Sequence, residues 1–131
     1  MREILFRGKS LYGGKWVEGF YCCLGGNYHY ILTGVLEIAN GYPDMVKHPV
    51  VPATVGQFTG LWDRNGKRIF EGDIVAIQSG TVFEMVGRVV FDEGAFQVVD
   101  PDDTYECLWY KQHEMEVLGN IHDKPGTSER R

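Results

Sequence analysis

The chain of 131 residues has few of the features that assign a location outside the cell or in a membrane. Its first apolar stretch, at residues 4 to 6, is far shorter than the core of a signal peptide. No segment approaches the roughly 20 consecutive apolar residues of a membrane-spanning helix. The sequence therefore predicts a protein of the cytoplasm.

Cysteine is scarce, with three residues: Cys22, Cys23 and Cys107. An odd number without C-x-x-C spacing is neither a disulfide framework nor a zinc site. If Cys22 and Cys23 lie on a strand, they face opposite sides of its sheet. We therefore predict one core thiol and one exposed thiol, both with structural rather than redox roles.

Motifs for catalysis or metal binding are also missing. There is no G-x-S-x-G, no P-loop and no G-x-G-x-x-G. The four histidines are His29, His48, His113 and His122. No two of them have the i, i+4 spacing of a zinc-binding helix, and none is adjacent to a cysteine. We predict no cofactor, no metal site and no enzyme, although a long-range pair of Cys23 with His29 stays open.

Two groups of carboxylates have more ordinary explanations. Asp63-x-Asn65-Gly66 resembles the start of a calcium loop, but the later ligands are absent, so the segment indicates a hairpin turn. Glu71 and Asp73 flank Gly72 at the start of a predicted strand. An acidic side chain at such a place usually accepts a hydrogen bond from a nearby backbone N–H, so we predict a structural role.

Positive charge is in short supply. Thirteen Lys and Arg face eighteen Asp and Glu, which gives a net charge of −5. Because nucleic-acid binding draws much of its energy from cations that neutralise phosphates, this balance argues against it. A local patch keeps it as a second hypothesis, made of Arg64, Lys67, Arg68 and Arg88.

Glycine is abundant, with 17 residues that mostly separate short apolar runs. This punctuation favours antiparallel strands joined by tight turns. We predict strands at residues 2–7, 15–22, 28–33, 74–77, 82–92, 95–99 and 117–121. Strand 82–92 is apolar on both faces, which predicts a central position in its sheet.

The remaining segments are less regular. Pro43, Pro49 and Pro52 predict an irregular connection at residues 34–56, with a short extended edge piece near 45–51. Residues 104–114 favour one or two helical turns. The polar residues 124–131 predict a disordered tail. The fold class is therefore mainly β, with an N-terminal antiparallel meander at 1–53 and a small barrel at 54–123.

Four pieces of the sequence carry a resemblance. They are MREILFR at residues 1–7, KWVEGFY at 15–21, the run 54–75 and EVLGNIH at 116–122. Together and in this order they resemble the YopX family of bacteriophage and prophage proteins, over about residues 1–123. The resemblance implies that the C-terminal barrel is SH3-like and that the chain is of phage or prophage origin, in a bacterial cytoplasm. It implies no biochemical activity and no site residue.

Aromatic residues are plentiful, with three Trp and seven Tyr. Aromatic side chains supply much of the energy at binding grooves and subunit interfaces. The candidates for such a role are Trp62, Trp109 and Tyr110.

Three functions follow in descending order. The first is a phage accessory protein that acts through protein contacts and self-associates as a homo-oligomer. The second is nucleic-acid association through the barrel. The third is an enzyme that uses Cys22 or Cys23 with His29 and a carboxylate.

Overall fold

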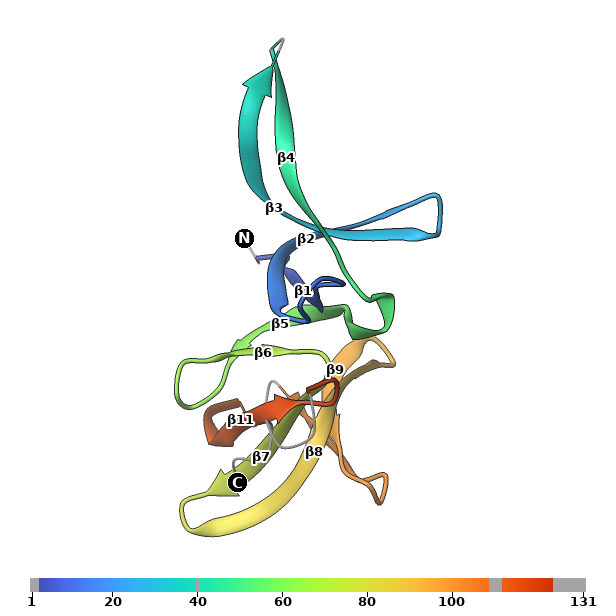
Figure 1. Cartoon of the computed structure of the whole chain (residues 1–131). Helices are drawn as coiled ribbons and strands as arrows, with labels where there is room; N and C mark the ends of the chain where they lie inside the picture. The colour runs from blue at the N-terminus through green and yellow to red at the C-terminus, as the bar shows by residue number, and fades with distance from the viewer. Residues whose placement is uncertain (1–2, 40, 109–111, 124–131) are drawn as a thin grey trace. The chain divides into compact units, whose positions relative to one another are not determined.

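The computed structural model describes residues 3–39, 41–108 and 112–123, and strands dominate this part of the chain (Figure 1). All strand pairs are antiparallel, which confirms the predicted mainly β class. The chain divides into two compact units, Met1–Gln57 and Phe58–Arg131. None of the helices in the described ranges is long and apolar enough to cross a membrane.

The N-terminal unit is a meander, as predicted. Its strands are β1 (Phe6–Lys9), β2 (Trp16–Leu24), β3 (Tyr28–Ala39) and β4 (Tyr42–Pro49), in the order β4-β3-β2-β1. A 3-10 turn, η1 (Pro52–Thr54), precedes β5 (Gly56–Trp62), whose first two residues pair with β1. The turns before and after β2 rest on glycine pairs at positive φ, Gly13-Gly14 and Gly25-Gly26.

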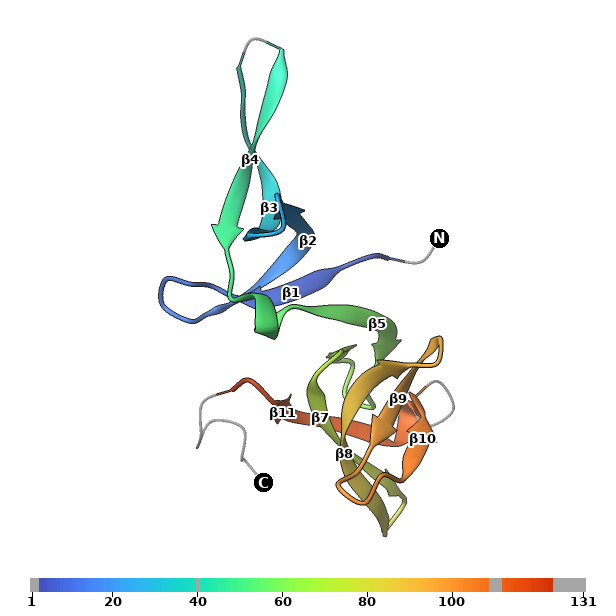
Figure 2. The same ribbon diagram turned by 90° about the vertical axis from the view of Figure 1, so that its right-hand side faces the viewer.

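Strand β3 extends well beyond its predicted end. It pairs with β2 only as far as Leu32, but it continues to Ala39 and pairs with β4 along that whole length. Residues 34–39 and 42–46 therefore form a two-stranded arm that extends away from β1 and β2 (Figures 1 and 2). The predicted irregular connection at 34–56 is wrong over this part. Pro43 and Pro49 do not prevent it because β4 is an edge strand, where proline is tolerated.

The C-terminal unit contains a five-stranded sheet in the order β10-β9-β8-β7-β11. Its strands are β7 (Asp73–Ser79), β8 (Val82–Asp92), β9 (Ala95–Val99), β10 (Tyr105–Cys107) and β11 (Met115–Asn120). The middle position of β8 confirms the prediction made from its two apolar faces. Within the described residues β10 and β11 are the two edges, and this sheet is not closed into a barrel.

A hairpin of β5 with β6 (Arg68–Phe70) completes this unit. Ile69 of β6 belongs to the same buried cluster as residues of the five-stranded sheet. That cluster consists of Ile69, Val75, Ile77, Met85, Val89, Val98, Leu108 and Met115.

The turns of this unit differ from the sequence-based expectation. Asn65-Gly66 favours a type I′ turn, but Gly66 alone has a positive φ there, and Asp63 O accepts from Gly66 N. This is the type I turn with a glycine bulge, stabilised by the Asp63 carboxylate. The two-residue turn with positive φ at both positions is at Glu93-Gly94, between β8 and β9.

The predicted helical turns at 104–114 are corrected in part. Residues 105–107 form β10, because they pair with the outer side of β9. Residues 112–114 form a 3-10 turn, η2 (Gln112–Glu114). Residues 109–111 and the predicted tail at 124–131 lie outside the described residues.

Candidate functional site

The β2–β3 hairpin carries an apolar surface that the unit itself does not cover. Directly opposed residues of an antiparallel pair share a face, and faces alternate along each strand. The register therefore places six residues on one side, which we call the hairpin face: Phe20, Cys22, Leu24, Tyr28, Tyr30 and Leu32. Exposure is 62% for Phe20, 63% for Tyr28 and 50% for Leu24. None of the six is buried.

Cations accompany the aromatic rings of this sheet. The Arg7 guanidinium lies 4.4 Å from the centre of the Trp16 ring, and the Lys9 ammonium lies 5.3 Å from it. The Lys47 ammonium lies 6.0 Å from the Tyr30 ring centre. Such contacts hold rings and cations in fixed relative positions at about 0.5–1 kcal/mol each on exposed sites.

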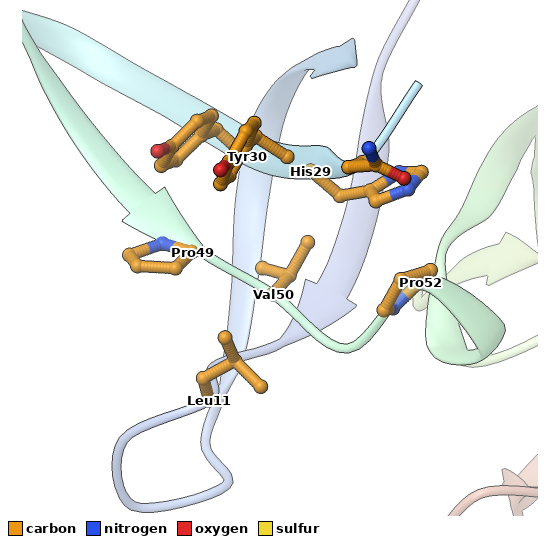
Figure 3. A pocket seen from close by; sticks show the side chains of 8 residues that line it. Leu11, His29, Tyr30, Pro49, Val50 and Pro52 are labelled. Carbon is orange, nitrogen blue, oxygen red and sulfur yellow. The ribbon is translucent and has the colours of Figure 1, made fainter. Parts of the chain in front are cut away.

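A shallow pocket of about 140 Å³ lies where β3 meets the end of β4 (Figure 3). Val50 stands between Pro49 and Pro52, with Leu11 from the β1–β2 loop on one side and His29 on the other. The Val50 N–H donates to His29 O, which fixes the strand ends that shape the pocket.

The other side of the β2–β3 hairpin brings Tyr21, Cys23 and His29 together. The Tyr21 hydroxyl and His29 Nδ1 are 2.5 Å apart, and their rings stack with an interplanar angle of 14°. Cys23 is directly opposite His29 in the register, and its Sγ lies 3.9 Å from Nε2. Burial, followed by the nearby Cys23 and Cys22 thiols, raises the pKa of Tyr21, so its phenol stays protonated at neutral pH.

The cysteines thus face opposite sides of β2, as predicted. Neither is in the core, however, because Cys22 is half-buried on the hairpin face and Cys23 is exposed. The expectation of one core thiol is wrong, since this sheet leaves both of its faces partly open at the hairpin. The Cys23–His29 pair that the sequence left open is brought into contact.

In the C-terminal unit, Asp63 organises the β5–β6 turn. Its Oδ1 accepts from Asn65 N and Lys67 N, both at 2.9 Å. Its Oδ2 accepts from Val117 N of β11, also at 2.9 Å. Both oxygens of this 6%-exposed carboxylate serve the backbone, which agrees with a hairpin turn rather than a calcium loop.

Asp73 has a comparable structural role. It is 1% exposed, and its Oδ2 accepts from Phe70 N across the Glu71-Gly72 turn. Its Oδ1 accepts from the side-chain amide of Asn120 at 3.0 Å. The predicted turn-capping role of this carboxylate is confirmed. Among the described residues, no cluster of three or more His, Cys, Asp or Glu could hold a metal ion.

Of the aromatic candidates, Trp62 ends β5 opposite Arg68 and is 44% exposed. Its ring packs edge-on against Phe58, with centroids 5.2 Å apart. Trp109 and Tyr110 lie outside the described residues. The strand register does not place Trp62 on the hairpin face, which belongs to different strands.

The basic candidates have neighbours of their own. Arg64 forms an ion pair with Glu116 at 2.9 Å, and Arg68 lies 5.6 Å from the Phe58 ring centre. Arg88 is on β8, between Ile74 of β7 and Val99 of β9. Residues 58–131 carry eight Lys and Arg against fourteen Asp and Glu, a net charge of −6.

The family model described as YopX protein matches residues 5–127, nearly the whole chain. The chain belongs to the YopX family. This confirms the resemblance carried by the four sequence pieces. Comparison with curated proteins returned no match for this YopX chain. The Glu71-Gly72-Asp73 and Gly119-Asn120 pieces of that resemblance meet in the Asp73–Asn120 hydrogen bond, so they serve the fold.

The hairpin face of this YopX protein was not among the features predicted from the sequence. Its signal was present, because apolar and aromatic residues occupy every second position from Phe20 to Leu24 and from Tyr28 to Leu32. Both alternating sets in these strands are largely apolar, and only one of them can face a core. A two-sided apolar hairpin in a small unit is the pattern that predicts an exposed patch.

Proposed function

We propose that this YopX protein is a phage or prophage accessory protein of the bacterial cytoplasm that acts through protein contacts, not catalysis, with a second copy of itself as first partner. The observation that carries the proposal is the uncovered apolar hairpin face beside a two-stranded arm. Both belong to the N-terminal unit, and both leave surface that a partner would bury.

The small core of this unit supports a partner. Its described residues include two buried apolar side chains, Ile31 and Val50. A domain of about 60 residues is marginal even with a complete core. Burial of the hairpin face would supply apolar contacts that the unit lacks alone.

The two-stranded arm also supports the proposal of a partner. A two-stranded ribbon without a third strand or a packed face is marginally stable in water. Within the described residues no third strand pairs with 34–39 or 42–46, which favours pairing of the arm with another strand. The arm is therefore best explained as a segment that becomes ordered against a neighbouring molecule.

An interface of ordinary size would need both the hairpin face and the arm. From their exposed fractions, Phe20, Leu24 and Tyr28 leave roughly 300 Å² for a partner, since an aromatic side chain buries about 150–250 Å². A stable interface needs about 800 Å² from each partner. These three residues cover less than half of that area, and the arm is a neighbouring surface that can supply part of the rest.

Charge favours a second copy on this surface. Residues 1–57 carry five Lys and Arg against four Asp and Glu, a net charge of +1. Two such units approach each other without appreciable repulsion, whereas two C-terminal units at −6 each repel. We therefore propose an isologous dimer through the N-terminal units.

We propose further that the C-terminal unit is an SH3-like barrel in an open form. Its support is the meander β7-β8-β9, the return of β11 to β7, and the burial of Ile69 from the β5–β6 hairpin in the core of that sheet. Nuclear Overhauser contacts between β6 and β10 would establish closure, and their absence would leave an open sheet.

Light scattering after size-exclusion chromatography tests the dimer. The wild-type protein at about 100 µM should elute with twice the mass of one chain. The double variant Phe20→Ser, Tyr28→Ser should elute as a monomer. A variant in which residues 34–46 are replaced by Asn-Gly should weaken the dimer without removing the hairpin face.

The matched control is Phe91→Ser, which removes a phenylalanine 55% exposed in the C-terminal unit. It should leave the mass of the dimer unchanged. A wild-type monomer at about 100 µM would overturn the self-association proposal. Equal effects of the Phe20 and Phe91 substitutions would show that the hairpin face is not the interface.

A second candidate function is nucleic-acid binding, favoured by the cations that accompany Trp16 and Tyr30 in the same sheet. Aromatic platforms with adjacent cations bind single strands by stacking and phosphate neutralisation. Fluorescence anisotropy with labelled oligothymidine should then show binding that weakens with salt and disappears in Lys47→Glu. No binding at 20 mM salt would remove this candidate.

A further inference from the structure

We propose that Cys23 is a reactive thiol, activated by His29, which exchanges with low-molecular-weight disulfides to form a mixed disulfide on the β2–β3 hairpin. This modification site is separate from the dimer proposal, because Cys23 and His29 lie on the side of the hairpin opposite the hairpin face.

The geometry is that of a nucleophile, a base and a group that orients the base. Cys23 Sγ lies 3.9 Å from His29 Nε2, within the reach of a sulfur hydrogen bond. The other ring nitrogen, Nδ1, meets the Tyr21 hydroxyl at 2.5 Å. When Nδ1–H donates to Tyr21, Nε2 presents its lone pair to the thiol, which is the arrangement that activates cysteine nucleophiles.

Tyr21 is held firmly enough to act as a positioning residue. Its ring stacks on the His29 ring, with the two ring centroids 5.9 Å apart. It also packs against the Phe6 ring, with centroids 5.7 Å apart. A tyrosine hydroxyl is neutral at pH 7, and burial raises the pKa of Tyr21 further, so the hydroxyl is available for the hydrogen bond to the imidazole.

Access suits a small reagent. Cys23 is exposed, so a disulfide can approach the sulfur from solvent. His29 also lines the pocket of about 140 Å³, which it shares with Tyr28 and Tyr30 of the hairpin face (Figure 3), so the thiol reaction is assigned to the exposed sulfur and not to this pocket.

The exchange balances without another reactant. Nε2 takes the S–H proton of Cys23, and the thiolate attacks one sulfur of R–S–S–R. A Cys23–S–S–R bond forms as the original S–S bond breaks. The second half leaves as a thiolate and takes the proton from the imidazolium. Cys23 is oxidised, and the small disulfide is reduced by the same two electrons.

Rates of reaction with 2,2′-dithiodipyridine test the proposal, because this neutral disulfide removes the influence of local charge. Two variants report one thiol each: Cys22→Ser, Cys107→Ser leaves Cys23, and Cys22→Ser, Cys23→Ser leaves Cys107. Cys107 is the matched control, because it is also an exposed strand cysteine and has no histidine contact among the described residues. Cys23 should react about tenfold faster or more at pH 7.

Adding His29→Gln to the Cys23 variant should lower its rate to that of Cys107. Rates for Cys23 and Cys107 within about twofold of each other would overturn the proposal, as would a His29→Gln rate equal to wild type. If His29→Gln proves unfolded by circular dichroism, Tyr21→Phe gives the decision, because it keeps the stacked ring and removes only the hydroxyl.

Tyr21→Phe should slow Cys23, leave Cys107 unchanged and shift the ¹⁵N resonances of His29 toward the other tautomer. A purely structural role for Tyr21 would leave those resonances unchanged. Unchanged resonances together with an unchanged Cys23 rate would remove the positioning role and the orienting geometry on which the proposal depends.

Discussion

The two units of this protein differ most in what they bury. Among the side chains whose burial is described, eleven apolar ones are buried between Phe58 and Met115, against Ile31 and Val50 in the N-terminal unit. Yet the N-terminal unit contains the longest strand, β3, and the β2–β3 hairpin exposes Phe20, Leu24 and Tyr28. Both units expose large apolar side chains, so the difference between them lies in how many they bury.

Buried polar groups follow the same division. The C-terminal unit encloses Asp63, Asp73 and Asn120, and their hydrogen bonds join turns to β11. Such buried, satisfied networks rigidify a fold. In the N-terminal unit the comparable polar cluster of Tyr21, Cys23 and His29 is at the surface. The larger buried core and the satisfied polar network indicate that the C-terminal unit is the more stable of the two, and this difference supports the proposal that the N-terminal unit binds a partner.

The sharpest test of this difference is a core truncation. Ile77→Ala removes a fully buried side chain from the main cluster and should destabilise the C-terminal unit by about 2–5 kcal/mol. Denaturant unfolding, followed by hydrogen exchange in peptides of residues 73–99, measures the effect. Val82→Ala, at a 62%-exposed position of the next strand, should change stability by less than about 0.5 kcal/mol. Equal effects would mean that the cluster is not the core.

The Asp63 carboxylate should rank second. Asp63→Ala leaves the N–H groups of Asn65, Lys67 and Val117 without their acceptor, at an expected cost of about 1–3 kcal/mol. Asp92→Ala is the control, because Asp92 is an exposed acidic residue of the same unit. Thermal unfolding of both variants gives the answer. A loss as small for Asp63 as for Asp92 would contradict the role assigned to the network.

A smaller expected effect is that the stability of the N-terminal unit, but not that of the C-terminal unit, depends on protein concentration. If two N-terminal units bind each other, the free energy of unfolding per mole of dimer should rise by about 1.4 kcal/mol for each tenfold increase in protein concentration. Hydrogen exchange at 5 and 50 µM should show slower exchange in residues 16–32, with no change in residues 73–99. Protection that is independent of concentration in both units would break the comparison, because the N-terminal unit would then be stable alone.

Sequence alone predicted the strands that obey simple local rules. Residues 82–92 and 95–99 match β8 and β9, because strong alternation and the Glu93-Gly94 turn leave little choice of register. The arm was missed, since its prolines argue against a strand until it is known that β4 has only one partner. The type of the Asn65-Gly66 turn was also missed, because the carboxylate of Asp63 decides it by tertiary contact with Val117.

The candidate site was partly within reach of the sequence. Cys23 and His29 were named as a possible pair, but only the hairpin register makes them direct neighbours. Tyr21 could not be assigned to them, because its contact with His29 is diagonal across the strands and depends on sheet twist. The hairpin face needed a further fact that no local pattern contains, namely that nothing in the described part of the chain covers it.

The smallest expected effect concerns alkaline pH in the N-terminal unit. Because the pKa of Tyr21 is raised in the folded protein, the unfolded chain loses this proton first as pH rises. The stability that Tyr21 contributes should therefore be complete below about pH 10, the ordinary tyrosine pKa, and should fall as pH rises through the higher folded value. Hydrogen-exchange protection of residues 16–32 at matched exchange times measures it.

Tyr21→Phe isolates this contribution from the lysines and other tyrosines that titrate in the same range. The variant keeps the ring that stacks on His29 and removes the ionisable hydroxyl. Its N-terminal unit should lose less stability between pH 9 and pH 11 than the wild type, and the C-terminal unit should respond identically in both proteins. The same loss in variant and wild type would mean that Tyr21 ionises as freely as in the unfolded chain, which would contradict the raised pKa that burial gives this residue.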